Sequence, residues 1–217
     1  MKIHHEGYRV IPWVLLILIL LNVAVFLIAG TSSLFMAILT VSLAFLLMNF
    51  WFFRDPGTLK NASPDEVISS ADGKVVVIEP VVENEYFGDE RIQVSVFMSV
   101  LNVHINHVPI EGEIVYQKHH PGRFMPAHLA KSSGENERCT TVLRTSKGDE
   151  ILVRQVAGIL ARKIVTYKKP GDHVSLKDQL GFIRFGSRVD IFLPKTAAVK
   201  VQMDQIVRGG ITVLAKI

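Results

Sequence analysis

Two long runs without a charged residue constrain the fold of this 217-residue chain more than any other feature. The first run covers residues 11–29 and the second covers residues 34–53, with a short connector between them. Each run has about the 20 residues that a helix needs to cross the ~30 Å hydrocarbon core of a bilayer. A signal peptide followed by a stop-transfer segment fits less well, because the apolar stretch is long and lacks a small-residue cleavage motif before polar sequence. We therefore expect residues 1–53 to form a transmembrane hairpin of two helices.

The residues that flank the two runs predict the orientation of the hairpin. We expect Trp13 near one membrane boundary and Trp51 near the other, where tryptophan is enriched. Positive side chains flank the runs, whereas the connector has none: Lys2, Arg9, Arg54 and Lys60. By the positive-inside rule, both ends of the hairpin and the chain that follows lie in the cytoplasm. The predicted location is the cell (inner) membrane, with residues 54–217 on its cytoplasmic side.

The charge of the chain favours an anionic membrane surface as a partner. The formal net charge is +4. Residues 1–53 contribute +1, from Lys2, Arg9 and Glu6, which leaves +3 for the remainder. A modest excess of this kind suits a domain that lies on an anionic leaflet. No dense Lys/Arg stripe with interleaved aromatics is present, so we expect no nucleic-acid partner.

The chain after Arg54 is predicted to be a single β domain over residues 54–217. Short β-branched runs alternate with Gly, Asp and Pro turn signals, which favours an all-β sandwich or barrel. These runs cover residues 74–81, 91–98, 112–118, 140–146, 150–158, 163–168 and 189–194. A polar stretch over residues 125–137 is expected to hold a short helix. The single Cys139 cannot form an internal disulfide, which agrees with a reducing compartment, and we expect it to be inert.

A weak repeat near the C-terminus favours a barrel-sandwich arrangement of this domain. Residues 169–183 are similar to residues 201–217, and each segment has an Asp-x-(Val/Ile) turn before an apolar strand. Such turns are common in the barrel-sandwich folds of biotinyl and lipoyl carrier domains. Those carriers present a lysine between their halves, whereas this chain has Arg-Phe-Gly-Ser-Arg over residues 184–188. A non-enzymatic, membrane-tethered carrier or adaptor is therefore an alternative, although the chain lacks the lysine to which the carried group would attach.

Gly186 and Ser187 form the first candidate for chemistry. A Gly-Ser pair among strands is usually only a bend or a bulge. The chemical alternative is that the Ser187 hydroxyl attacks the carbonyl of Gly186, where the missing Cβ leaves room for the attack. Such a reaction needs a base.

Histidine and aspartate residues could supply that base. His104 and His107 lie in a short polar segment, where a histidine can act as a general acid or base. Asp72 precedes a strong strand and could orient an imidazole, although an Asp-Gly pair alone is most often a turn. A histidine metal site is the competing hypothesis, with His119, His120 and His128 as further ligands. The chain lacks an HExxH pattern and a cysteine pair, so we predict no metal.

Six blocks of sequence together resemble the phosphatidylserine decarboxylases, in particular their short membrane-hairpin form. The blocks occur in the family's order: FFRDP (52–56), SSADGKV (69–75), FMSVLNVHINHVPI (97–110), PGRFMPAHLAKSSGENER (121–138), VRQVAGILARKIV (153–165) and FGSRVDIFLP (185–194). The resemblance covers essentially all of residues 52–217 and extends to the hydrophobic N-terminus. Two departures are Cys139, where Asn is expected, and the Gly-Thr pair at 57–58. Neither involves the candidate residues above.

The resemblance implies that the chain makes its own cofactor. By similarity, Ser187 attacks Gly186 and the chain is cut between them into residues 1–186 and 187–217, which stay associated. The residue at position 187 becomes a pyruvoyl group. The same resemblance implies that His107 is the base for this maturation and that Asp72 orients His107.

The resemblance also implies the reaction of the mature enzyme. The pyruvoyl group forms a Schiff base with the amine of phosphatidylserine, CO2 leaves, and His104 protonates the resulting carbon to give phosphatidylethanolamine. Arg54 and Arg188 are candidates to meet the phosphate or carboxylate of the lipid. An archaeal ether-linked serine phospholipid (archaetidylserine) is an alternative substrate with the same head group. A homo-oligomer is compatible with the sequence.

Overall fold

The computed structural model describes all residues except 1, 58–61, 128, 130–131, 160–162 and 185. The chain divides into two compact units, Met1–Gly57 and Thr58–Ile217. The boundary therefore lies a few residues after the one expected from the sequence.

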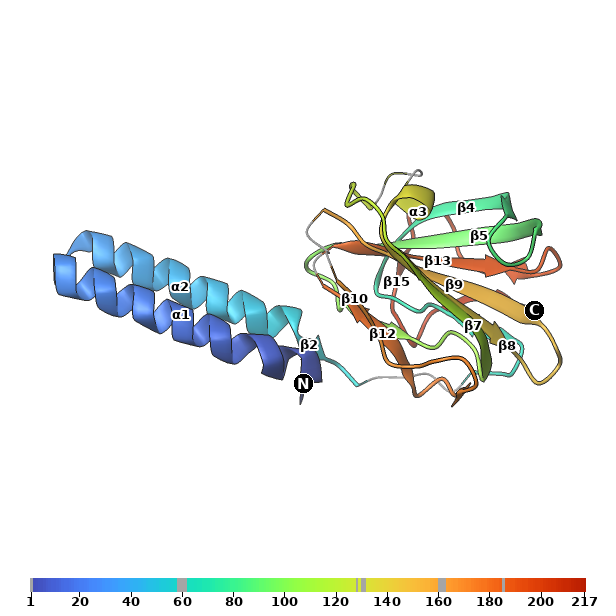
Figure 1. Ribbon diagram of the computed structural model, residues 1–217, viewed down its shortest axis with the longest axis horizontal. Helices are drawn as coiled ribbons and strands as arrows, with labels where there is room; N and C mark the ends of the chain where they lie inside the picture. The colour runs from blue at the N-terminus through green and yellow to red at the C-terminus, as the bar shows by residue number, and fades with distance from the viewer. Residues whose placement is uncertain (1, 58–61, 128, 130–131, 160–162, 185) are drawn as a thin grey trace. The chain divides into compact units, whose positions relative to one another are not determined.

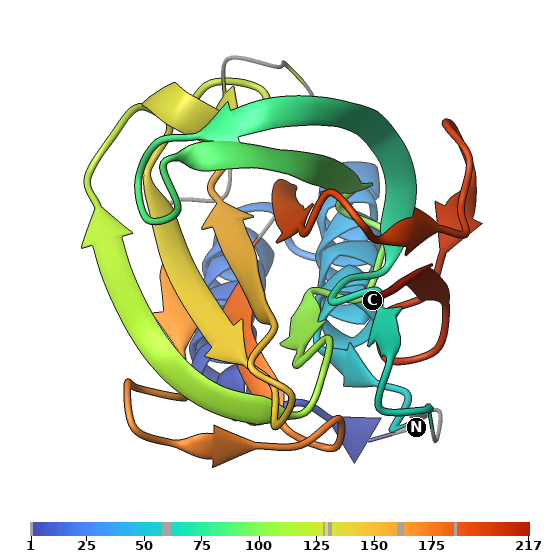
Figure 2. The same cartoon turned by 90° about the vertical axis from the view of Figure 1, so that its right-hand side faces the viewer.

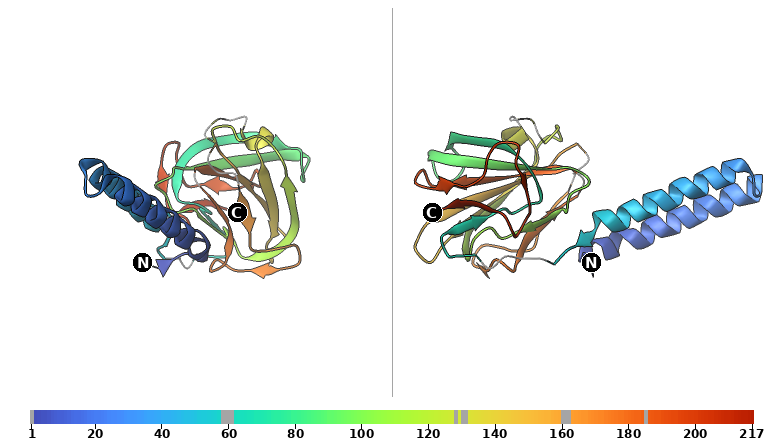
Figure 3. Two further views of the ribbon diagram at one scale, coloured as in Figure 1. Left: turned by 60° about the vertical axis from the view of Figure 1, so that its left-hand side comes forward. Right: turned by 180° about the vertical axis from the view of Figure 1, so that it is seen from behind.

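The first unit is a helical hairpin. Helix α1 (His5–Ala29) and helix α2 (Ser33–Phe52) run side by side in opposite directions (Figure 3). By length and composition, both helices could cross a membrane. Asn22 Nδ2 donates to Ser42 Oγ at 2.9 Å between the helices. Large apolar side chains cover their outer faces, and Ile28 is 87% exposed, which suits a surround of lipid.

Two details of the hairpin differ from the sequence prediction. Helix α1 begins at His5 rather than at residue 11, because the His4 side chain caps it by accepting from the Glu6 N–H at 3.3 Å. Strands β1 (Lys2–Ile3) and β2 (Arg54–Asp55) pair and join the two ends of the hairpin. The antiparallel helices therefore bring Trp13 and Trp51 toward the same end, so the prediction of opposite boundaries was wrong.

An antiparallel sheet of eight strands forms the larger part of the second unit. Its order is β11-β7-β8-β9-β13-β5-β4-β15, and the sheet curls strongly over its width (Figure 2). The strands are β4 (Gly73–Glu83), β5 (Asp89–Met98), β7 (Gly112–His120), β8 (Arg138–Arg144), β9 (Glu150–Val156), β11 (His173–Val174), β13 (Ser187–Leu193) and β15 (Ile206–Val207). The mainly β, barrel-like fold class predicted from the sequence is confirmed.

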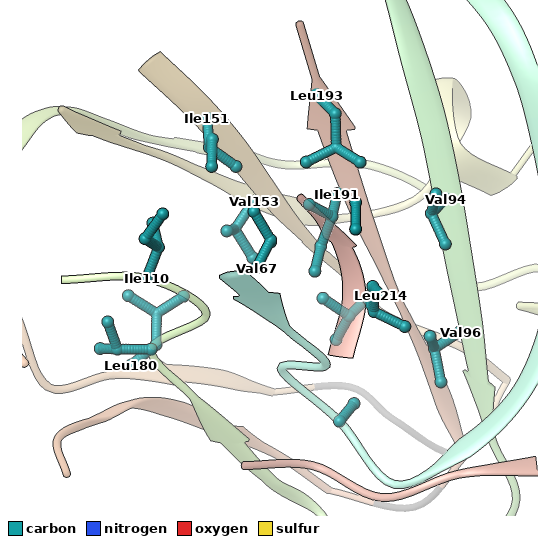
Figure 4. Close-up of a cluster of buried hydrophobic side chains, with 14 of the residues drawn as sticks. Val67, Val94, Val96, Ile110, Ile151, Val153, Leu180, Ile191, Leu193 and Leu214 are labelled. Atoms are coloured by element: carbon teal, nitrogen blue, oxygen red, sulfur yellow. The ribbon is translucent and has the colours of Figure 1, made fainter. Parts of the chain in front are cut away.

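Two three-stranded sheets complete the β unit. One has the order β10-β12-β6, and the other has the order β14-β16-β3. Their strands are β3 (Glu66–Ile68), β6 (Ile105–His107), β10 (Ile164–Thr166), β12 (Gln179–Ile183), β14 (Ala198–Val199) and β16 (Val213–Lys216). Buried aliphatic side chains from all three sheets, including Val67, Ile191 and Leu180, form the core (Figure 4). Burial of this apolar surface is the main stabilising contribution to the unit.

The order of the eight-stranded sheet is symmetric about its central β9–β13 pair. The symmetry matches β11 with β15, β7 with β4 and β8 with β5. The hydrogen bonds follow it: Ile68 N–H donates to the Pro109 carbonyl, and His107 N–H donates to the Ser70 carbonyl, both at 2.8 Å. The repeat noted at residues 169–183 and 201–217 thus corresponds to β11–β12 and β15–β16, which occupy matching places.

The symmetry also shows where the chain passes between the two halves. Strands β6 to β12 form one continuous half, and this half is inserted between β5 and β13 of the other. In the inserted half, a short turn with Gly148 at φ +91° joins β8 to β9. The matching position in the other half holds Gly186, at φ +72°. The two crossings between the halves therefore contain His104 and Gly186.

A charged cluster covers the outer face of the large sheet. The Glu83 carboxylate accepts from the N–H groups of Tyr86 and Phe87 and from Arg154 Nη2, the last at 2.6 Å. Burial raises the pKa of Glu83, but these donors and Arg154 outweigh it and hold the pKa below its ordinary value.

The short helix expected within residues 125–137 is α3 (Ser132–Glu135), which also lies on this unit (Figure 1).

Candidate active site

Gly186 and Ser187 lie where the chain enters central strand β13. Ser187 pairs with Met98 of β5, its side chain is fully buried, and its Oγ donates to Met98 Sδ at 3.2 Å. Gly186 has φ +72°, in the left-handed region that a residue with a Cβ enters at a cost of about 1–2 kcal/mol. The local backbone therefore favours glycine immediately before the serine.

His104 contacts this junction directly. Its Nε2 accepts from the Gly186 N–H at 3.0 Å, and its Nδ1 lies 3.0 Å from the Asn102 carbonyl oxygen. Because Nε2 accepts, the proton of the neutral ring belongs on Nδ1, which donates to Asn102. The side chain is buried. The structure thus brings His104 to Gly186, although 82 residues separate them in the sequence.

The loop after β9 closes on the carbonyl group of Gly186. A Cβ on Gly158 would lie 2.3 Å from the Gly186 carbonyl oxygen, which is far inside van der Waals contact. The next closest side chain to that Cβ is Ala127, at 3.4 Å. Glycine is therefore required at position 158 for the backbone to come this close to the Gly186 carbonyl. Nothing in the sequence around Gly158 predicts this contact.

His107 and Asp72 form a second group around Gly209. Asp72 Oδ1 accepts from the Gly209 N–H at 2.8 Å, and a Cβ on Gly209 would lie 3.1 Å from His107 Cδ2. His107 ends strand β6, which begins one residue after His104, so this strand connects the two groups. The imidazole and the carboxylate thus share one neighbour, the backbone of Gly209.

A pair of buried amides extends the site behind Met98. Gln155 Nε2 donates to Asn106 Oδ1 at 2.6 Å, and Asn106 Nδ2 lies 3.6 Å from Met98 Sδ. All three side chains are fully buried. This chain of contacts fixes the Met98 sulfur, which accepts from Ser187. No pattern in the sequence indicates these contacts, since a lone Asn or Gln is usually a surface residue.

Comparison with known proteins identifies the family of this chain. The family model described as phosphatidylserine decarboxylase matches residues 45–215. The chain belongs to the phosphatidylserine decarboxylase family. It is 46% identical to the phosphatidylserine decarboxylase proenzyme of Amoebophilus asiaticus, over 100% of this chain and 97% of that protein. Proteins of the same name from Cytophaga hutchinsonii and Bacteroides thetaiotaomicron are 45% and 44% identical, over 100% of this chain and 99% and 95% of theirs.

Membership of the phosphatidylserine decarboxylase family decides between the interpretations of the sequence. The resemblance drawn from the six sequence blocks is confirmed, and the family consists of enzymes. A barrel-sandwich carrier without enzymatic activity is therefore not supported. The word proenzyme in the relatives' names indicates that they are made as precursors.

Arg188 does not face the candidate site of this family member. The side chain is 1% exposed and lies on the opposite face of β13 from Ser187. Its guanidinium pairs with the Asp190 carboxylate and donates to Ser95 Oγ at 2.8 Å and to the Leu129 carbonyl at 3.2 Å. The expectation that Arg188 meets the phosphate or carboxylate of a substrate was wrong, because its donors are enclosed by the protein.

The remaining candidates for chemistry have structural partners. His120 Nε2 lies 2.7 Å from Glu85, and His119 Nε2 lies 3.6 Å from Glu137, whereas His128 is outside the described residues. Within the described ranges, no three metal-ligating side chains converge on one point. Cys139 is buried, and burial raises the pKa of its thiol to about 11, so it is not a nucleophile at neutral pH.

Proposed function

We propose that this chain is a proenzyme that cuts itself between Gly186 and Ser187 and then decarboxylates phosphatidylserine to phosphatidylethanolamine. The observation that carries the proposal is the Gly186-Ser187 junction, where the Gly186 N–H donates to His104 Nε2. The chain that contains this junction is a member of the phosphatidylserine decarboxylase family. The relatives are named for phosphatidylserine, which favours the diacyl lipid over an archaeal ether-linked serine lipid. The product and the reaction make the chain a carboxy-lyase.

The cut itself uses only atoms of the chain, and one water molecule then completes the pyruvoyl group. Ser187 Oγ attacks the Gly186 carbonyl carbon, a C–O bond forms, and the C–N bond to Ser187 breaks, which leaves an ester. Loss of the Ser187 Cα proton then expels the Gly186 carboxylate and leaves a dehydroalanine. Water converts this end to a pyruvoyl group and releases ammonia. The absent Cβ atoms of Gly186 and Gly158 leave room around the carbonyl.

His107 is the proposed base for this step, and Asp72 is the residue that positions it. The Ser187 hydroxyl must give up its proton as Oγ attacks, and the hydroxyl must turn away from Met98 Sδ to do so. A neutral imidazole can accept the proton. The support for this pair is their shared contact with the Gly209 backbone, where the Gly209 N–H holds Asp72 Oδ1 in place.

The residues around position 187 fit a pyruvoyl group. Such a group supplies a ketone that joins to the substrate amine and accepts the electrons released as CO2 leaves. The group is smaller than serine, and the site is buried and lined by Met98 and the Asn106–Gln155 amides. His104, whose Nε2 accepts from the Gly186 N–H in the uncut chain, is the proposed residue that delivers a proton to the substrate carbon.

The hairpin gives the proposed location. Helices α1 and α2 hold the chain in the inner membrane, and positive residues at their ends favour the cytoplasmic side for the β unit. The two chains, residues 1–186 and 187–217, stay associated because β13 remains paired with β5 and β9. Phosphatidylserine and the anionic surface that contains it are the partners.

The experiment that tests the proposal is Ser187→Ala, with Ser146→Ala as the control. Ser146 is an exposed serine in the β8–β9 turn, the counterpart of the Gly186 junction. Ser187→Ala should run as one full-length band on a denaturing gel and release no CO2 from phosphatidylserine. Ser146→Ala should be cut and active. Cleavage of Ser187→Ala into two chains would refute the assignment of the nucleophile.

A further inference from the structure

Exposed apolar side chains gather on one part of the β unit. Among the described residues of Thr58–Ile217, seven large apolar side chains are exposed. Four of them lie on three loops: Val100 and Leu101 between β5 and β6, Leu129 before α3, and Ile159 between β9 and β10. We call these four residues the apolar rim. The others, Val82, Met203 and Ile206, lie on other segments.

All three loops of the apolar rim converge on the cleavage junction. A Cβ on Gly186 would have Val100 Cγ1 as its nearest neighbour, at 3.8 Å. The residue before Ile159 is Gly158, which adjoins the Gly186 carbonyl oxygen. Ala127, two residues before Leu129, lies 3.4 Å from the Cβ position of Gly158. The three loops of the rim thus lie close to Gly186.

Exposure of these side chains to water is unfavourable. Leu101 is 65% exposed and Ile159 is 54% exposed, whereas Val100 and Leu129 are each 43% exposed. Single exposed apolar residues are common, but several around one site indicate a surface that a partner protein, a ligand or a membrane covers. Protruding apolar side chains of this kind gain free energy when they enter the boundary between lipid head groups and acyl chains.

The chemistry of the substrate identifies the lipid bilayer as the partner that covers the apolar rim. This step rests on the proposed function. The reacting atom at position 187 is fully buried, so the serine head group must enter the protein to reach it. The two acyl chains must remain in hydrocarbon during this entry. Gly186 is partly exposed, so apolar side chains beside it allow the acyl chains to stay in contact with nonpolar atoms while the head group leaves the membrane surface.

We propose that the apolar rim inserts into the bilayer surface and brings the Gly186–Ser187 junction next to lipid. The partner is the head-group and upper acyl region of a phospholipid membrane. The transmembrane hairpin keeps the β unit near the membrane, and the rim determines which face of that unit meets the lipid.

The direct test labels the rim with an environment-sensitive fluorophore. Leu101→Cys provides the attachment point, because the native Cys139 is buried with a raised pKa and does not compete. The control is Val82→Cys. Val82 is 59% exposed and lies near the end of β4, where it pairs with Glu90 at the start of β5, whereas Leu101 follows the end of β5. The full-length protein is reconstituted in phosphatidylcholine–phosphatidylglycerol vesicles. Spectral blue shift and quenching by spin-labelled lipid are measured.

Insertion predicts a blue shift and strong quenching for the Leu101 label and neither for the Val82 label. Equal, water-like spectra at both positions would overturn the proposal. Because these vesicles contain no phosphatidylserine, the result does not depend on the reaction. Strong quenching at both positions would also overturn it, since the rim would then not be the face that meets lipid.

A kinetic test separates this proposal from the proposed function. The double variant Leu101→Ser/Ile159→Ser is compared with wild type on phosphatidylserine in vesicles and on a monomeric short-chain phosphatidylserine in solution. We expect the ratio of the vesicle rate to the solution rate to fall about tenfold, as two apolar contacts with lipid are lost, and Val82→Ser to leave it unchanged. An unchanged ratio in the double variant would overturn the role of the rim. A wild type that decarboxylates neither substrate would instead overturn the proposed function.

Discussion

The close approach of Gly158 to the Gly186 carbonyl leads to a sharp prediction for Gly158→Ala. The added Cβ would lie 2.3 Å from the Gly186 oxygen. Ordinary contact requires about 3.4 Å, so the two groups must separate by about 1 Å. The Gly186 side cannot yield easily, since Arg188 two residues on is paired with both Phe97 and Val156. A displacement of about 1 Å at a reacting carbonyl can lower a rate by about 10²-fold.

The assay for Gly158→Ala is the rate of self-cleavage after synthesis. Full-length chain and the two products are separated on a denaturing gel at successive times, and we expect cleavage slowed by about 10²-fold. Gly134→Ala is the matched control, because a Cβ at Gly134 meets nothing within 4 Å. Protection of Cys139 from a maleimide reports whether the variant is folded. A folded Gly158→Ala protein that is cut at the wild-type rate would refute the reasoning.

Three further predictions concern single side chains. His107→Ala should block cleavage, whereas His104→Ala should permit at least part of it and impair turnover; equal loss of both activities in the two variants, measured by gel and by CO2 release, would contradict the division of roles. Glu83→Gln should lower the urea midpoint of the detergent-solubilised chain at pH 7, because the depressed pKa of Glu83 means that its ionised form stabilises the fold. This stability is lost as pH falls from 4.5 through the lower folded pKa, so the urea midpoints of wild type and Glu83→Gln should converge there. A difference between the two midpoints that stays constant with pH would count against this role of Glu83. Cys139 should resist a maleimide at pH 8 until the protein is unfolded, because burial raises its pKa to about 11; rapid labelling of native protein would contradict the burial.

The elements that the sequence predicted are those with a long physical signature. Two runs of about 20 uncharged residues predict helices whatever surrounds them, and α1 and α2 follow. Strands β4, β5, β7, β8, β9 and β13 are seven residues or longer and were found from their β-branched runs. Strands β11, β14 and β15 have two residues each and carry no periodicity, so only tertiary pairing reveals them.

The candidate site was predicted from residue types and family resemblance, and its surroundings were not. The contact between His104 and Gly186 depends on the insertion of one half of the fold into the other, which short-range patterns do not encode. Arg188 was misassigned because an arginine next to a reactive serine suggests an anion, whereas strand alternation turns it to the opposite face. Gly158 matters through a missing atom, and sequence alone does not show which backbone needs the space.

The central claim is that the 217-residue chain is a precursor whose active form is two chains. The most direct measurement is the intact mass of protein purified from membranes under denaturing conditions, together with the decarboxylase activity of the same preparation. We predict one chain of residues 1–186 and one of residues 187–217, the latter lighter than a serine-terminated chain by one ammonia and resistant to Edman degradation. An active preparation that contains only the continuous chain with Ser187 intact would contradict the account.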